Sequence, residues 1–217
     1  MKNIFSILIL FFLLLFSAKI VAQTLIENGS LDSVYHSNAT FTTTTLNDLK
    51  GNWNYLGVVQ TYYQRKNDSL NVRVLLDFFP RHRPNMRSFL ETKLNYPLCK
   101  NDTCQLSFSI GSGNYMVIDR IGAYFSDSLI TIDSVEQVTP QVHTPNHKFY
   151  HEPGYTKINL TYIAKGGEQY LTIGNFVPGN RAHYKIYPKN KNAGPGQYMI
   201  DNISLEDSCY RPESVFK

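Results

Sequence analysis

The chain has 217 residues, a formal net charge of +4 and 18% charged residues. The charge is small and no block of Lys or Arg marks a phosphate-binding surface, so no nucleic-acid partner is expected. Tyr (15) and Phe (13) far outnumber the single Trp, and Asn, Ser and Thr are frequent between the apolar runs. This composition is typical of a secreted all-β domain.

The start of the chain has the features of a secretory signal peptide. Lys2 precedes an apolar run over residues 4–16, and a short stretch then leads to Ala22. The run is shorter than the roughly 20 residues that a bilayer-spanning helix needs. A signal peptide over residues 1–22 is therefore favoured over a membrane anchor. We expect cleavage after Ala22, export to the periplasm or the outer cell surface, and no membrane span after signal removal.

The rest of the chain is predicted to form one domain over residues 23–209, followed by a C-terminal tail over residues 210–217. About 195 residues are enough for a sizeable core. Short aromatic and β-branched runs are separated by Gly, Pro, Asn and Asp, as in sandwiches and barrels. The predicted strands are 24–35, 53–63, 71–79, 88–94, 105–110, 115–125, 157–164, 169–176, 182–187 and 198–205. The expected fold is an all-β, antiparallel β-sandwich of the jelly-roll type.

Aromatic and planar polar residues gather in and just after the second predicted strand and suggest a binding surface. Sugars stack their C–H faces on aromatic rings, and planar polar groups hold their hydroxyls. The candidate ligand-binding residues are Trp53, Tyr55, Gln60, Tyr62, Tyr63 and Arg65, with Tyr115 in a later loop. The alternative is that these rings belong to the core or the sheet surface, and Trp53 alone would be equally suited to burial.

The cysteines suit an oxidising compartment. Cys99 and Cys104 flank a short segment that contains turn-forming Asn101 and Asp102. From Cys104 to Ile110, apolar and polar residues alternate as in a half-buried strand. We predict a hairpin with a Cys99–Cys104 disulfide across its turn. A metal pair would need two more ligands, and Cys209 is left over.

Histidines recur every fourth residue at His143, His147 and His151. This spacing would align three metal ligands on one face of a helix. Pro145 and Pro153 argue against a helix here, so the histidines are predicted to lie in a solvated loop.

Several blocks resemble a known family of modules. Asn28-Gly29-Ser30-Leu31-Asp32 is similar to the opening strand of bacterial jelly-roll modules of the galactose-binding, carbohydrate-binding type. The segments 92–98, 118–126, 166–176 and 198–205 are similar to later blocks of that family. Its nearest members are secreted modules of Bacteroidota, often fused ahead of an OmpA-like domain. The resemblance implies a surface-presented binding domain.

Asp201 lies in the last predicted strand. Strict alternation places it on the same face as Met199 and Ile203, pointing into the core. A buried carboxylate needs hydrogen-bond donors or a cation. The resemblance implies a structural Ca²⁺ held by Asp32 and Asp201, with backbone carbonyls completing the shell. The alternative is that Asp201 accepts backbone N–H groups or pairs with Lys or Arg.

The function expected from these features is non-catalytic binding of glycan or cell-envelope material, with carbohydrate or a cell-surface glycan as the partner. No Gly-x-Ser-x-Gly, His-Glu-x-x-His or phosphate-binding glycine motif is present, so the chain is not expected to be an enzyme. The alternative is a structural or adhesive envelope protein that makes protein–protein contacts. An aromatic-lined groove on the concave sheet would favour sugar, and a flat apolar patch would favour protein.

Overall fold

Antiparallel strands make up most of the described chain, which confirms the predicted β-sandwich of jelly-roll type. The structure is a computed structural model that describes residues 23–27, 29–31, 52–56, 60–66, 69–78, 87–112, 116–135, 137–151, 154–178, 181–187 and 196–209. Within these ranges, α-helix is confined to α2 (Ile132–Val135). In the same ranges, no helix is both long and apolar enough to cross a bilayer.

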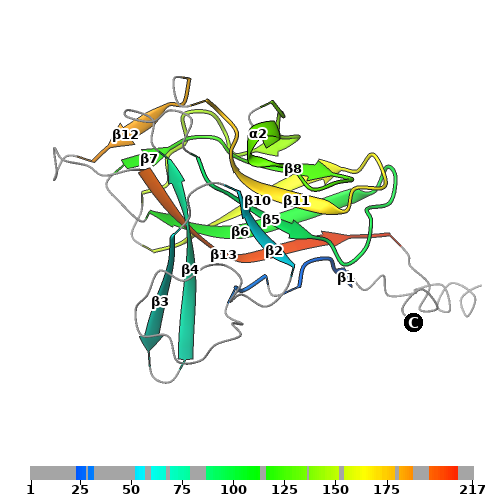
Figure 1. The fold of residues 1–217 in the computed structure, drawn as a ribbon, viewed down its shortest axis with the longest axis horizontal. Helices are drawn as coiled ribbons and strands as arrows, with labels where there is room; N and C mark the ends of the chain where they lie inside the picture. The colour runs from blue at the N-terminus through cyan, green and yellow to red at the C-terminus, as the bar shows by residue number, and fades with distance from the viewer. Residues whose placement is uncertain are drawn as a thin grey trace, which may run out of the picture.

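The first sheet has the strand order β10-β6-β13-β4-β3, and β1 pairs with β13 beside this path. Its strands are β1 (Gln23–Thr24), β3 (Gln60–Lys66), β4 (Ser69–Phe78), β6 (Thr103–Ser112), β10 (Thr156–Ile163) and β13 (Gly196–Asp207). Gln23 lies opposite Asp207, so the first and last described strands are neighbours. The β3–β4 hairpin projects away from the two layers (Figure 1).

The second sheet has the order β2-β5-β11-β8-β9, and a separate pair joins β7 to β12. The strands are β2 (Trp53–Leu56), β5 (Phe89–Lys93), β8 (Ile121–Ser126), β9 (Val142–His143) and β11 (Tyr170–Asn175), with β7 (Met116–Ile118) and β12 (Tyr184–Ile186) in the pair. β11 is central in its sheet. It begins at Tyr170, opposite Ser126, and ends at Asn175, opposite Ile121.

The core lies between the two sheets. Along β6, Leu106, Phe108 and Ile110 are buried, whereas the residues between them are more exposed, as the predicted alternation requires. Phe125 of β8 stacks on Tyr162 of β10 with ring centroids 4.3 Å apart, which joins the two layers directly. Each apolar side chain of this size stabilises the fold by about 1.5–3 kcal/mol when fully buried.

Two predicted strands are each divided in the structure. The predicted strand 53–63 forms β2 and β3, which belong to different sheets. The predicted strand 115–125 forms β7 and β8, separated by Asp119 and Arg120. Arg120 has a φ of 58°, a left-handed conformation that ends one strand and redirects the chain into the next. β9 was not predicted.

The predicted inward orientation of Asp201 is wrong, because β13 contains a bulge. Ile200 pairs with Ile110 and both are buried. Between Asp201 and Ser204 the register shifts, so that three steps on β13 match two steps on β6. The extra residue exchanges the two faces of the strand. Asp201 is therefore half-buried on the outer face, opposite half-buried Ser109.

The predicted Cys99–Cys104 disulfide is also wrong. Cys99 is bonded to Cys209, across a sequence separation of 110, with the two Cα atoms 6.0 Å apart. The expected hairpin does not exist, because β5 and β6 belong to different sheets and the segment between them crosses the sandwich. Cys104 is a buried thiol on β6, pointing into the core with an exposed fraction of 0%. The disulfide joins the chain just after the last strand to the second half of this crossing segment, shortly before β6 begins.

Candidate functional site

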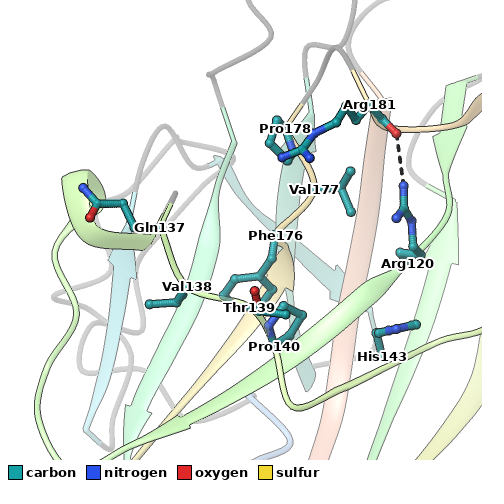
Figure 2. A pocket seen from close by; sticks show the side chains of 10 residues that line it. All are labelled: Arg120, Gln137, Val138, Thr139, Pro140, His143, Phe176, Val177, Pro178 and Arg181. Carbon is teal, nitrogen blue, oxygen red and sulfur yellow. Dashed lines mark hydrogen bonds between the residues drawn. The ribbon is translucent and has the colours of Figure 1, made fainter.

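A pocket of about 400 Å³ lies at the end of β11, beside the turn that leads into β8. It is formed by the β7–β8 turn, the segment from α2 to β9, and the chain that follows β11. The lining residues are Arg120, Gln137, Val138, Thr139, Pro140, His143, Phe176, Val177, Pro178 and Arg181 (Figure 2). Because these segments are far apart in the sequence, the pocket is a product of the tertiary fold.

The floor of the pocket is apolar and tightly packed. Phe176 is nearly buried and its ring centroid lies 5.0 Å from that of Phe89. Gly122 on β8 makes room for this floor, since an added Cβ would lie 2.9 Å from Pro140 and 3.2 Å from Phe176. Any larger residue at position 122 would displace both side chains. The floor is therefore a fixed surface against which an apolar ligand face can pack.

Asn175 holds the chain in place where β11 ends. Its side-chain amide donates to the Asp119 carbonyl at 2.8 Å, and its side-chain oxygen accepts the Val177 N–H at 2.9 Å. A turn follows, in which the Arg181 N–H donates to the Pro178 carbonyl at 2.8 Å. These bonds fix the wall of the pocket relative to the β7–β8 turn.

Two guanidinium groups give the pocket its charge. Arg120 Nη2 donates to the Arg181 carbonyl at 3.0 Å, which orients the Arg120 side chain along the wall (Figure 2). Arg120 Nε lies 3.5 Å from Asp119 Oδ1, an ion pair that is too long for a strong hydrogen bond. The Arg181 side chain is exposed. None of the described lining residues carries a carboxylate, so the pocket is suited to an anionic group.

His143 adds a polar group at the edge of the pocket. Its Nδ1 lies 2.7 Å from the Thr144 carbonyl, which only accepts, so Nδ1 carries the proton. In the neutral ring Nε2 is then an acceptor. With Gln137 and Thr139, this nitrogen provides hydrogen-bond partners for hydroxyl groups.

The predicted aromatic surface is only partly described, and one of its members is a core residue. Trp53 has an exposed fraction of 5% and its Nε1–H donates to the Glu27 carbonyl at 3.1 Å. The predicted stacking role of Trp53 is therefore wrong, because its ring faces the core. The remaining candidates lie outside the described residues or have side chains that do: Tyr55, Gln60, Tyr62, Tyr63, Arg65 and Tyr115. Their binding role stays a prediction.

The predicted calcium site depended in part on Asp201 facing the core. Asp201 does not face the core, and its Oδ1 accepts the Asn202 N–H at 2.7 Å, as in the alternative that the sequence left open. Asp32 lies outside the described residues. Calcium binding by Asp32 and Asp201 therefore stays a prediction.

Sequence reasoning missed the pocket because no single motif contains it. Arg120 and Arg181 are separated by 61 residues. The one usable signal was Arg120 directly after Asp119, two charged residues that interrupt an apolar strand pattern. Such an interruption indicates a turn or a site.

Comparisons with known proteins give distant likenesses only. No family model matches the chain. No curated protein matches it either. Solved structures that resemble it include a cyclase from Fischerella sp. TAU, with 15% identity, a TM-score of 0.46, and 88% of this chain and 100% of that chain covered. An adhesin domain of Lys-gingipain from Porphyromonas gingivalis has 11% identity, a TM-score of 0.45, and 87% and 99% coverage.

A third likeness is to the xylan-binding domain of a protein from Paenibacillus barcinonensis. It has 9% identity and a TM-score of 0.43, and covers 75% of this chain and 88% of that chain. Likenesses of this size identify neither a family, nor a ligand, nor an activity.

Proposed function

We propose that the chain is a secreted, non-catalytic module that binds glycan or cell-envelope material carrying acidic groups, and that the pocket at the end of β11 is its binding site. The observation that best supports this proposal is the presence of Arg120 and Arg181 in a pocket whose described lining has no carboxylate. A guanidinium group can bind a carboxylate, sulfate or phosphate through two parallel N–H bonds. A charge-assisted bond of this kind contributes about 1.5–3 kcal/mol.

The other walls suit a sugar ring. Ligand pockets are mostly apolar with a few convergent polar groups and have volumes of roughly 300–1,000 Å³. The volume of about 400 Å³ is at the small end of this range. Phe176, Pro140 and Pro178 offer apolar surface to C–H groups, while Gln137 and Thr139 offer partners to hydroxyls. The pocket thus has both kinds of group that a glycan requires.

Export is supported by two independent features. Residues 1–22 have the pattern of a signal peptide. The Cys99–Cys209 disulfide is of the kind that persists in oxidising compartments. A module outside the cytoplasm would meet cell-surface and envelope glycans directly.

A binding role is favoured over catalysis by the chemistry of the lining. His143 is the one imidazole in the described lining, and no carboxylic acid lies beside it there. General acid–base cleavage of a glycosidic bond uses a pair of carboxylic acids. The described lining offers cations and hydrogen-bond partners instead, which bind a ligand without attacking it.

A glycan array with neutral, uronic-acid, sulfated and phosphorylated glycans tests the proposal. The protein is expected to bind one or more acidic glycans, and Arg181→Ala should weaken this binding about tenfold. Arg181 is a suitable target because its side chain is exposed and its carbonyl, which orients Arg120, is retained. Lys157→Ala is the matched control, since it removes an exposed cation from β10 in the first sheet.

Three results would contradict the proposal. The first is that the protein binds no glycan, and the second is that it binds neutral glycans alone. The third is that Arg181→Ala and Lys157→Ala lose affinity for an acidic glycan equally. If the chain binds an envelope protein and no glycan, the result would support the adhesive alternative.

A further inference from the structure

Asp119, His147 and His183 converge from three segments of the chain, beside Arg120 of the pocket lining. Each offers one potential metal-ligand atom, and these atoms all lie within 4.8 Å of one another. Asp119 is in the β7–β8 turn, His147 in a turn after β9, and His183 directly before β12. We propose that these three side chains bind a divalent transition-metal ion such as Zn²⁺.

The carboxylate of Asp119 is buried but only partly satisfied. Its exposed fraction is 0%, and its Oδ2 accepts the His147 N–H at 2.8 Å and lies 3.1 Å from His183 Nδ1. Oδ1 accepts no hydrogen bond among the described residues, and its nearest cationic atom is Arg120 Nε at 3.5 Å. A buried carboxylate oxygen without donors costs free energy, and a bound cation would remove this cost.

The neighbours of Asp119 lower the pKa of its carboxyl group. Burial by itself would raise the pKa of its carboxyl group. The hydrogen bonds from His147 and His183, with the nearby charge of Arg120, outweigh this effect and leave the pKa below its usual value.

The two imidazole rings are positioned to complete the site. Their centroids are 4.1 Å apart with an interplanar angle of 41°, and both residues are exposed, so an ion can reach them. His183 has a side-chain exposed fraction of 50%. A bound ion would replace the hydrogen bond between His183 Nδ1 and Asp119. Nδ1 must then lose its proton in order to bind the ion, and in the neutral ring this proton moves to Nε2.

The donor set and the spacing fit zinc. Imidazole nitrogen and carboxylate oxygen bind Zn²⁺ at about 2.0–2.2 Å, which places ligand atoms of a tetrahedral site about 3.3 Å apart. Small rotations of the exposed rings would bring the three atoms from their present spacing to this distance. Three protein ligands leave the fourth position open to water or to a ligand oxygen.

The backbone already ties these segments together. The Asp119 N–H donates to the His183 carbonyl at 3.1 Å, and the Thr144 N–H donates to the Ile121 carbonyl at 2.9 Å. Little chain entropy would therefore be lost on binding. The opposing factor is the positive charge of Arg120, which lies beside the carboxylate and weakens its attraction for a second cation.

Titration of the protein with Zn²⁺ by calorimetry, and with Co²⁺ by visible absorption, tests the site. The wild type should bind one ion, and Co²⁺ should give the absorption bands of a tetrahedral complex. His147→Ala and His183→Ala should each weaken binding at least about tenfold. Arg120→Gln should tighten it, because the competing charge is removed.

The matched control is His143→Ala, which removes an exposed histidine that is not in the cluster. It should leave the affinity unchanged. His147→Ala is the safer cluster variant, since the backbone N–H that anchors Asp119 is retained. No binding by the wild type, or an equal loss in His143→Ala and His147→Ala, would overturn the proposal.

Discussion

The two ends of β11 each carry a buried carboxylate, and the two are satisfied in different ways. Before β11, Glu168 Oε1 accepts the Tyr162 hydroxyl at 2.6 Å and the Lys165 N–H at 2.8 Å, and Oε2 accepts the Gly166 N–H at 2.9 Å. Beside the C-terminal end of β11, Asp119 Oδ1 of the β7–β8 turn accepts no hydrogen bond within the described chain. A buried carboxylate whose two oxygens both accept hydrogen bonds stabilises the fold, whereas a buried carboxylate oxygen that accepts none, beside a pocket, indicates a binding site.

The Glu168 end is reinforced by further links. The Cys99–Cys209 disulfide closes it, and Asp102 accepts the Ser208 hydroxyl at 2.6 Å and the Ser208 N–H at 3.0 Å. At the Asp119 end, the pocket is lined by side chains that remain available to a ligand. Stabilising contacts are therefore concentrated at the first end of β11 and binding chemistry at the second. Variants at the two ends should therefore separate stability from binding.

Loss of the disulfide should have the largest effect. The double variant Cys99→Ser/Cys209→Ser removes a link across 110 residues and should lower the free energy of unfolding by about 2–5 kcal/mol. Chemical denaturation measures this change. Reduction of the wild type should reproduce it, and reduction of the double variant should add nothing. A peptide map that links Cys99 to Cys104 would contradict the structure.

Glu168→Gln should have the next largest effect, a loss of about 2–3 kcal/mol at pH 7, because charge-assisted bonds are removed. Hydrogen bonds outweigh burial and lower the pKa of Glu168 in the folded state. Its stabilising contribution is therefore complete above the unfolded pKa and disappears as the pH falls through the folded value. Between pH 7 and pH 2, the free energy of unfolding should decrease less steeply in Glu168→Gln than in the wild type. The control Glu206→Gln, at an exposed position, should follow the wild-type curve.

The contribution of Glu91 to stability should change with pH in the opposite direction. Burial raises its pKa, although Ile130 N–H and Thr172 hydroxyl donate to it. Its ionised form is disfavoured in the folded state, so stability should fall as the pH rises from the unfolded pKa to the folded one. Glu91→Gln should raise the free energy of unfolding at pH 7, because it removes a buried charge that the folded state disfavours. A loss as large as that of Glu168→Gln would show that the charge of Glu91 is stabilising.

Arg181→Ala should have the smallest effect on the fold, a change within about 0.5 kcal/mol. The affinity for an acidic ligand should nevertheless fall about tenfold. Thermal unfolding and titration of the same sample measure the two quantities together. A large loss of stability would place Arg181 among the structural residues, against the comparison between the two ends.

The sequence predicted the features that depend on local pattern. The alternation from Cys104 to Ile110 correctly predicted β6, and the turn residues marked most strand boundaries. Asp201 was misplaced because a bulge adds one residue to β13, and alternation cannot reveal where the phase changes. The disulfide was mispredicted for a related reason, since sheet assignment is a long-range property.

No local sequence pattern predicted the candidate site. Arg120 and Arg181 meet only because β7, β8 and β11 bring their turns to the same end of the sandwich. Likewise, His147 approaches His183, and not His143 or His151, because its loop folds over Asp119. The four-residue histidine spacing therefore carried no information about the cluster.

The binding site at the end of β11 is tested by mapping ligand contacts from NMR chemical shifts, recorded while an acidic oligosaccharide found on the array is titrated into the protein. We expect the largest shifts at Arg120, Phe176, Val177 and Arg181, with the 166–169 segment unchanged. Shifts concentrated at residues 166–169 or along β3, with the end of β11 unaffected, would contradict it.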